Sequence, residues 1–146
     1  MEPTSAIFRH LRRVLQQAYF LQSMGPKELD KLMGALRAMR VFKGYEIIRQ
    51  GDPGDAFYLI ASGRVSVWVD KGRGPVRVVG LRSDEYFGEM ALVSNEPRNA
   101  SVIAEMLTEL FVLEKYNFDQ ILMKNPAIAQ KIKEAHQRRH EITSKL

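Results

Sequence analysis

The sequence predicts a single α+β domain that is mostly β, with a run of about seven or eight antiparallel strands between helices at the two ends of the chain. Apolar residues recur at helical spacing near both termini. Between Val41 and Leu113, short runs of β-branched and aromatic residues are separated by glycine-containing turns at intervals of roughly ten residues. A length of 146 residues suits one hydrophobic core. The central pattern is typical of a small antiparallel sandwich or barrel.

Residues 1–40 form the predicted N-terminal helical bundle. Its first helix is amphipathic, with an apolar face made of Ile7, Leu11, Val14, Leu15 and Ala18. Residues 23–26 interrupt this pattern, and Pro26 suits the first turn of a second helix because the N–H that proline lacks is unpaired there anyway. The apolar face of the second helix consists of Leu29, Leu32, Met33 and Leu36.

Residues 41–114 form the predicted run of strands. The clearest strand is Val65–Val69, in which valine alternates with other residue types, as expected where one face is buried. Gly72 and Gly74 favour a turn between this strand and the next run, Val76–Leu81. Two further strands are expected, around Ala100–Met106 and Glu109–Leu113.

Residues 115–146 return to helical spacing and form the predicted C-terminal helices. The first is marked by Phe118, Ile121 and Leu122, and the second, after the break at Asn125 and Pro126, by Ile128, Ile132 and Ala135. Residues 136–146 are polar without a distinct apolar face, which leaves an exposed helix and a frayed tail as alternatives.

The net charge of +5 arises at the two ends of the chain. Residues 3–27 contain four basic and no acidic residues, and residues 115–146 contain seven basic and three acidic residues. Solvated faces of terminal helices explain this excess, and a docking surface for an acidic partner, phosphate or membrane headgroups is the alternative. Direct nucleic-acid binding is not expected, because residues 28–114 carry eleven basic and thirteen acidic residues.

The chain has no cysteine, which excludes disulfide bonds and thiolate catalysis. No apolar run approaches the roughly 18 residues that a membrane span needs. The first residues lack the layout of a signal peptide, so we expect a cytoplasmic domain, whole or part of a larger protein. His136 and His140 have a spacing that suits a metal on a helix, but no third ligand is near in the sequence, and we expect no metal site.

Residues 86–102 interrupt the strand pattern and carry the candidate chemistry. Gly88 has no Cβ and allows the backbone to approach a ligand closely. Residues 90–93 suit one helical turn, whose first N–H groups can bind an anion. Arg98 can direct two parallel hydrogen bonds at the same anion, and Glu89 can accept a hydroxyl proton.

Each of these features alone is usually a turn or a surface residue, so the signal lies in their combination. Together they suit a ligand that has one phosphate and one sugar hydroxyl group. Glu89 acting as a general base on a phosphodiester is the enzymatic alternative. Hydrolases of this kind normally recruit metals, and because no ligand cluster is visible we expect binding without catalysis.

The same segment resembles the phosphate-binding cassette of the cyclic-nucleotide-binding domain family, whose pattern is Phe-Gly-Glu-x-Ala-Leu, a short loop, and Pro-Arg-x-Ala-x-Val. Residues 87–92 and 97–102 fit the two parts without a gap. The resemblance extends upstream over residues 44–65 and covers most of the chain, from Tyr19 to Ile132. It implies an eight-stranded antiparallel β-roll, or jelly roll, with N-terminal helices and C-terminal lid helices.

The resemblance implies roles for individual residues. Arg98 holds the exocyclic phosphate oxygens, Glu89 and the Gly88 backbone hold the ribose 2′-hydroxyl, and a backbone N–H near Ala91 adds a phosphate contact. The implied ligand-binding residues are Gly88, Glu89, Met90, Ala91, Arg98, Asn99 and Ala100, and the candidate base contacts are Val79, Leu81, Ile132 and His136.

The implied ligand is cAMP or cGMP, and no cofactor is expected. The position after the arginine is often Ala in cAMP-preferring members and Thr or Ser in cGMP-preferring members. This chain has Asn99 there, whose amide both donates and accepts hydrogen bonds. We favour cAMP.

Three functions are compatible with such a domain. We favour a stand-alone bacterial-type sensor or regulatory module that acts on a separate effector protein, and the alternative is the cytoplasmic gating domain of a cyclic-nucleotide-gated channel, joined to a pore domain. A transcription regulator is less favoured, because residues 115–146 are used by two helical segments and leave no helix-turn-helix. Occupancy is expected to move the terminal helices, with a lid from Ala127 to about Arg139. A homo-oligomer is also compatible with the sequence.

Overall fold

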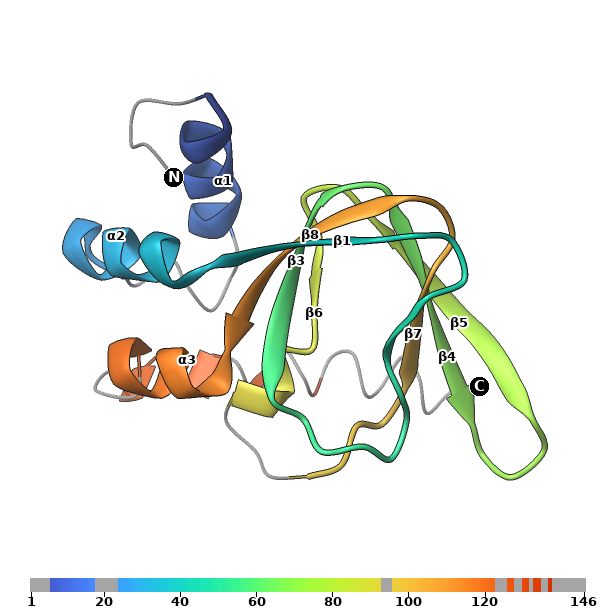
Figure 1. The fold of residues 1–146 in the computed structure, drawn as a ribbon. Coiled ribbons are helices and arrows are strands. Elements are labelled where there is room, and N and C mark those ends of the chain that lie inside the picture. The colour runs from blue at the N-terminus through green and yellow to red at the C-terminus, as the bar shows by residue number, and fades with distance from the viewer. Residues whose placement is uncertain are drawn as a thin grey trace.

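The computed structural model describes residues 6–17, 24–92 and 96–122, together with 126–127, 130–131, 133–134 and 137. In these residues the helices are α1 (Ala6–Gln17), α2 (Pro26–Ala35) and α3 (Lys115–Leu122), and a short 3₁₀ helix is η2 (Glu89–Leu92). The strands are β1 (Arg37–Val41), β2 (Glu46–Ile48), β3 (Ala56–Ser62), β4 (Arg64–Asp70), β5 (Pro75–Arg82), β6 (Tyr86–Phe87), β7 (Ser101–Ala104) and β8 (Thr108–Glu114). Figure 1 shows the helices gathered beside one end of the strands.

The strands form two four-stranded antiparallel sheets, in the orders β1-β8-β3-β6 and β2-β7-β4-β5. β3 lies between β8 and β6, and its neighbours are far from it in sequence. β4 pairs with β5 on one side, and its residues Val65–Trp68 pair with β7 on the other. The prediction of an eight-stranded antiparallel β-roll between helices is confirmed over the described residues.

The two faces of β3 bury side chains in different cores. Phe57 and Leu59 pack with the helices in a cluster that includes Leu15, Leu32 and Phe118. The alternate residues of β3 face the barrel interior, with Ala56, Tyr58 and Ile60 in a second cluster that also contains Val65, Phe87, Val102 and Leu110. Because successive strand residues point to opposite faces, β3 connects the helices directly to the barrel interior. Its five buried residues in succession reflect this position.

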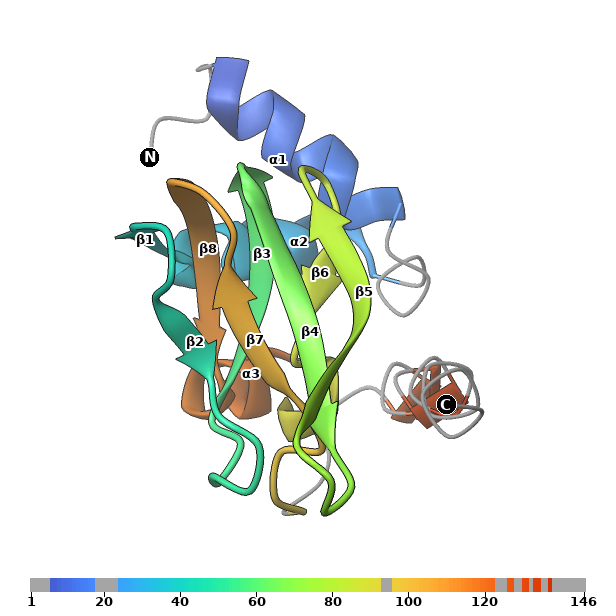
Figure 2. The same ribbon diagram turned by 90° about the vertical axis from the view of Figure 1, so that its right-hand side faces the viewer.

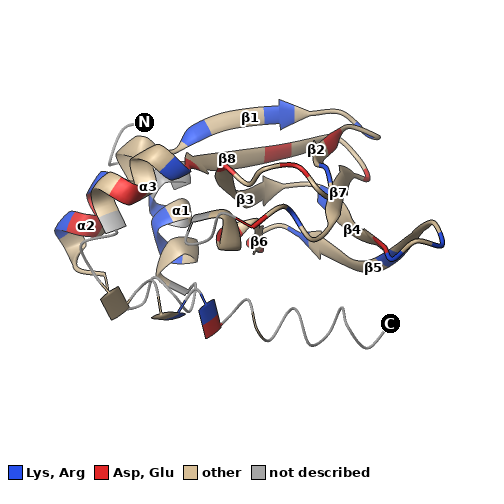
Figure 3. Cartoon of the chain, turned by 90° about the horizontal axis from the view of Figure 1, so that it is seen from below, with Lys and Arg blue, Asp and Glu red and all other residues tan. Residues whose placement is uncertain are grey.

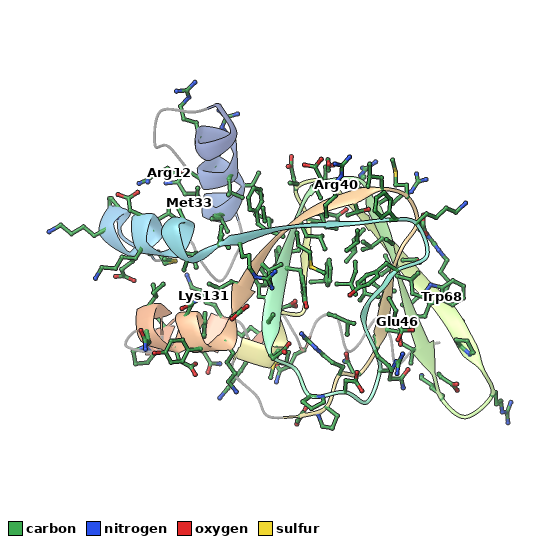
Figure 4. The ribbon with its side chains drawn as sticks, in the orientation of Figure 1. Arg12, Met33, Arg40, Glu46, Trp68 and Lys131 are labelled. Carbon is green, nitrogen blue, oxygen red and sulfur yellow. The ribbon has the colours of Figure 1, made fainter. Side chains whose placement is uncertain are left out.

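The second N-terminal helix, α2, begins where its sequence suggests but ends one residue earlier. Pro26 occupies the start of α2, and Leu29, Leu32 and Met33 form its buried face. Leu36, predicted on the same face, is the extended residue that ends the helix, and it packs only partly buried against the core. Arg12 of α1 forms an ion pair with Asp30 of α2, between the two helices (Figure 4). Ala18 lies outside the described residues.

Charged residues of both signs are interspersed on the surface. Basic positions on β1 lie beside acidic positions on β8 (Figure 3), and Arg37 pairs with Glu114 at 3.4 Å. Glu105, in the turn after β7, forms ion pairs with Arg77 and Arg64. The hydrogen bond from Arg77, together with the charges of both arginines, lowers the pKa of the Glu105 carboxyl group. In the described part of the chain, no helix combines the length and the apolar character that a membrane crossing requires.

Candidate ligand-binding site

A cavity of about 320 Å³ lies between η2, β5 and the segment that leads into β7. Its walls are mainly apolar and consist of Ile48, Val67, Val78, Val79, Leu81, Phe87, Met90, Ala91, Pro97, Ala100 and Val102. Its polar residues are Glu85, Glu89, Glu96, Arg98 and Asn99. An apolar hollow with a few polar groups on one side is typical of a site for a small organic ligand.

Gly88 occupies a position that a larger residue would not fit. Its φ of +80° lies in the left-handed region, where a Cβ is unfavourable. A Cβ there would also lie 3.0 Å from Nη1 of Arg98 and 3.1 Å from the carbonyl oxygen of Ala56. The absence of a side chain therefore allows the turn between β6 and η2 to close on the arginine.

The guanidinium of Arg98 is half-buried at this turn. Its Nη1 donates to the carbonyl oxygen of Gly88 at 3.1 Å, and its Nη2 donates to that of Ala56 at 2.7 Å. Burial lowers the pKa of Arg98, and the nearby Tyr58, Asp55 and Glu89 oppose that shift. The cation is thus partly removed from water and is held by neutral carbonyl groups, which leaves it able to attract an anion.

The backbone of Arg98 is held separately by the loop between β2 and β3, residues 49–55. The Arg98 N–H donates to the carbonyl oxygen of Asp52 at 2.8 Å, and the Gly51 N–H donates to that of Arg98 at 2.8 Å. Pro53 and Pro97 form an isolated antiparallel bridge beside them. The arginine predicted from a motif of neighbouring residues is therefore placed by a segment more than forty positions earlier in the chain.

Glu89 is buried, with only 2% of its surface exposed, and it lines the cavity from the start of η2. The predicted single helical turn is confirmed as η2, which begins one residue earlier than expected. The N–H of Ala91 donates to the carbonyl oxygen of Gly88 at 3.2 Å, inside this turn. The backbone N–H of Ala91, which the resemblance implied as a phosphate contact, therefore has a hydrogen-bond partner within the protein in this structure.

The remaining predicted residues are distributed around the same cavity. Met90 and Ala100 are half-buried in its wall, and Asn99 is exposed at its edge. Val79 and Leu81 of β5 also line it, with Val79 41% exposed and Leu81 buried. The side chains of Ile132 and His136, the other candidate base contacts, lie outside the described residues.

Several lining residues are absent from the sequence prediction. Val67 lies opposite Val79 in the β4–β5 pair, so the alternation of β4 combined with its pairing was the signal for it. Glu85 and Glu96 add two carboxylates, and Phe87 stacks on Tyr58 with ring centroids 5.0 Å apart. Burial also raises the pKa of Tyr58.

Among the residues described here, no three histidine, aspartate or glutamate side chains form a group that could hold a metal ion.

A family profile described as the cyclic nucleotide-binding domain matches residues 39–125. The chain therefore belongs to this family. The cAMP-dependent protein kinase regulatory subunit of Aspergillus niger is 37% identical over 108 residues, which are 74% of this chain and 26% of that protein. The chain thus spans about a quarter of the length of this relative.

Solved structures of regulatory subunits share the fold. The regulatory domain of Toxoplasma gondii PKA, solved with cAMP, has a TM-score of 0.76 and 30% identity, covering 88% of this chain and 49% of that one. The regulatory subunit of a cAMP-independent protein kinase A from Trypanosoma brucei has a TM-score of 0.74 and 25% identity, covering 86% and 45%. One of these structures was thus solved with cAMP, and the other is the regulatory subunit of a kinase described as cAMP-independent.

Proposed function

We propose that this chain binds a cyclic nucleotide, with cAMP favoured over cGMP, in the cavity between η2 and β5. The observation that carries the proposal is the half-buried guanidinium of Arg98, hydrogen-bonded to Gly88 and Ala56 at 3.1 and 2.7 Å. Arg98 and the buried Glu89 line the same cavity, so a phosphate and a ribose hydroxyl can be bound side by side.

Each polar group has a distinct proposed role. The exocyclic phosphate oxygens accept hydrogen bonds from Arg98, which has the planar fork needed for two parallel bonds. The 2′-hydroxyl donates to the carboxylate of Glu89, beside the Gly88 backbone. The apolar wall that includes Val79 and Leu81 accepts the base, and Asn99 lies at the cavity edge.

The proposed signal travels from the cavity to the helices. η2 contacts both β3 and α3, so a shift of η2 on ligand binding would displace α3 and the residues packed around it. A ligand that binds one arrangement of η2 more tightly shifts the population toward it by that difference in affinity. We propose that the helices within residues 1–40 and within residues 115–146 move relative to the β-roll, whose first strand, β1, begins at Arg37. We further propose that a lid from Ala127 to about Arg139 covers the base.

We propose that occupancy regulates a separate effector protein. The support is the similarity to proteins named as kinase regulatory subunits, of which this chain matches one portion. A protein kinase is accordingly the first effector to test. We propose a binding role in a bacterial-type regulatory module, which the sequence favoured over a channel gating domain.

Calorimetric titration of the chain with cAMP and with cGMP tests the ligand assignment. We expect saturable binding of cAMP with a Kd of about a micromolar or below, and weaker binding of cGMP. Stronger binding of cGMP would overturn the proposed preference for cAMP. No binding of either nucleotide would overturn the proposed function.

The substitution Glu89→Gln tests the ribose contact. The amide keeps the size of the side chain but replaces a charged acceptor, and a hydrogen bond to a charged group contributes about 1.5–3 kcal/mol. We expect binding of cAMP to weaken by about tenfold or more, and binding of 2′-deoxy-cAMP to change little. Equal losses for both nucleotides in calorimetry would remove Glu89 from this role.

A further inference from the structure

We propose that Gln50 is a positioning residue that sets the place of Arg98 by fixing the loop between β2 and β3, an inference that rests on the function proposed above. Gln50 does not line the cavity, and its distance from Arg98 in the sequence gives no hint of a connection. The argument rests on the hydrogen bonds that this residue makes with separate parts of the barrel.

The side chain of Gln50 binds the backbone of Asp70 in the manner of a strand neighbour. Its Nε2 donates to the carbonyl oxygen of Asp70 at 2.9 Å, and its Oε1 accepts from the Asp70 N–H at 2.8 Å. Asp70 is the last residue of β4, so the primary amide ties the loop to the end of the β4–β5 hairpin. A side chain of another shape or length cannot make both bonds at once.

The backbone of Gln50 is tied to a second strand. Its N–H donates to Oγ of Ser101 at 2.9 Å, at the first residue of β7. Figure 2 shows the β2–β3 loop, the entrance to β7 and the β4–β5 hairpin together at one end of the barrel. Gln50 is therefore fixed from both sides before the chain reaches the residues that contact Arg98.

The next two residues hold the arginine. Gly51 and Asp52 exchange two backbone hydrogen bonds with Arg98, both 2.8 Å long. The backbone of Arg98 is thus held by a loop whose own position depends on Gln50. Bidentate contact to phosphate tolerates little displacement, since hydrogen bonds weaken steeply away from their preferred length and angle.

The substitution Gln50→Ala tests this role by two measurements. Hydrogen exchange of the Gly51 and Arg98 amides is expected to become about tenfold faster, while the amides of β8 remain protected. The Kd for cAMP is expected to rise about tenfold, the effect of losing two hydrogen bonds of ordinary net strength. Gln50→Glu keeps the acceptor, loses the donor, and is expected to show smaller changes in both measurements.

A double-mutant cycle separates positioning from general destabilisation. In the Arg98→Lys background, the loss of cAMP affinity caused by Gln50→Ala should shrink to about threefold or less, because a flexible point charge depends less on backbone position. In the Glu89→Gln background, the full loss of about tenfold in cAMP affinity should persist. Ser66→Ala is the matched control, since it removes the acceptor of the Trp68 indole N–H on the same sheet and should lower Tm without changing the Kd.

The outcomes separate this inference from the proposed function. Unchanged exchange of the two amides, or equal losses of affinity in the Arg98→Lys and Glu89→Gln backgrounds, would overturn the role of Gln50. If the wild-type chain binds neither nucleotide, the proposed function fails, whereas faster exchange in Gln50→Ala would still support the placement of Arg98 by this loop.

Discussion

Replacing Arg98 by alanine is expected to weaken cAMP binding by about 100-fold to 10,000-fold. Two hydrogen bonds to a charged phosphate are lost, each contributing about 1.5–3 kcal/mol, and every 1.4 kcal/mol is a factor of ten in Kd. The half-buried site enlarges the effect, because the phosphate would enter a region of low polarity without a counter-charge. Calorimetric titration of Arg98→Ala beside the wild type measures it.

The same substitution also removes structural hydrogen bonds, so stability needs its own measurement. The carbonyl oxygens of Gly88 and Ala56 lose their donors in Arg98→Ala, and we expect a lower Tm as well. Arg98→Lys keeps the positive charge but lacks the planar guanidinium, so its affinity for cAMP should lie between those of the wild type and Arg98→Ala. Arg73→Ala, on the exposed turn between β4 and β5, is the matched control and should bind as the wild type does.

A folded Arg98→Ala protein that binds cAMP as tightly as the wild type would refute the placement of phosphate at Arg98. The lowered pKa of this residue makes no testable contribution in the neutral range, because an arginine side chain remains charged there. The expected loss of affinity in Arg98→Ala should accordingly be the same from about pH 6 to pH 8, to within about twofold.

Gly54→Ala is expected to weaken cAMP binding by about tenfold to 100-fold by pushing η2 away from the β2–β3 loop. A Cβ on Gly54 would lie 2.6 Å from Cβ of Ala91, a distance at which one of the two must move. It would also lie 3.3 Å from Nε of Arg98. The clash therefore affects both the cavity wall at Ala91 and the side chain of Arg98 that we propose binds phosphate. Titration with cAMP measures the combined effect.

The clash predicts its own rescue. Ala91→Gly removes the atom that is struck, so the pair Gly54→Ala and Ala91→Gly should recover most of the lost affinity. Gly34→Ala is the control for added bulk, since a Cβ on this residue of α2 would meet nothing within 4 Å and alanine is favoured over glycine in a helix. Failure of the double variant to bind better than Gly54→Ala would show that the steric account is wrong.

The role of Gly54 differs from that of the glycines at ordinary turns. Gly44 and Gly51 have φ values of +91° and +92°, and a Cβ on either would meet nothing within 4 Å, so their backbone conformation is what requires glycine. Gly54 has no such φ and is required by the close approach of Ala91. Both kinds read alike in a sequence, because a close approach depends on a residue distant in the chain.

The sequence by itself determined the class of fold and indicated the residues that we propose bind the ligand. Periodicity is a local property, so the helices at both ends and the alternation in β4 could be predicted without knowing any neighbour. The combination of Gly88, Glu89 and Arg98 was equally local, since all three lie within eleven consecutive residues. Leu36 was misassigned because the end of a helix depends on where the following strand begins, and β1 begins at Arg37.

Only the tertiary structure decided how those residues are held. The carbonyl of Ala56, the close approach of Gly54 and the hydrogen bonds from the loop of Gln50 all reach Arg98 or its turn from segments far earlier in the chain. Strand pairing between segments far apart in sequence creates these contacts, and its register depends on the packing of the whole barrel. The chemistry of this site is therefore local, whereas its geometry belongs to the fold.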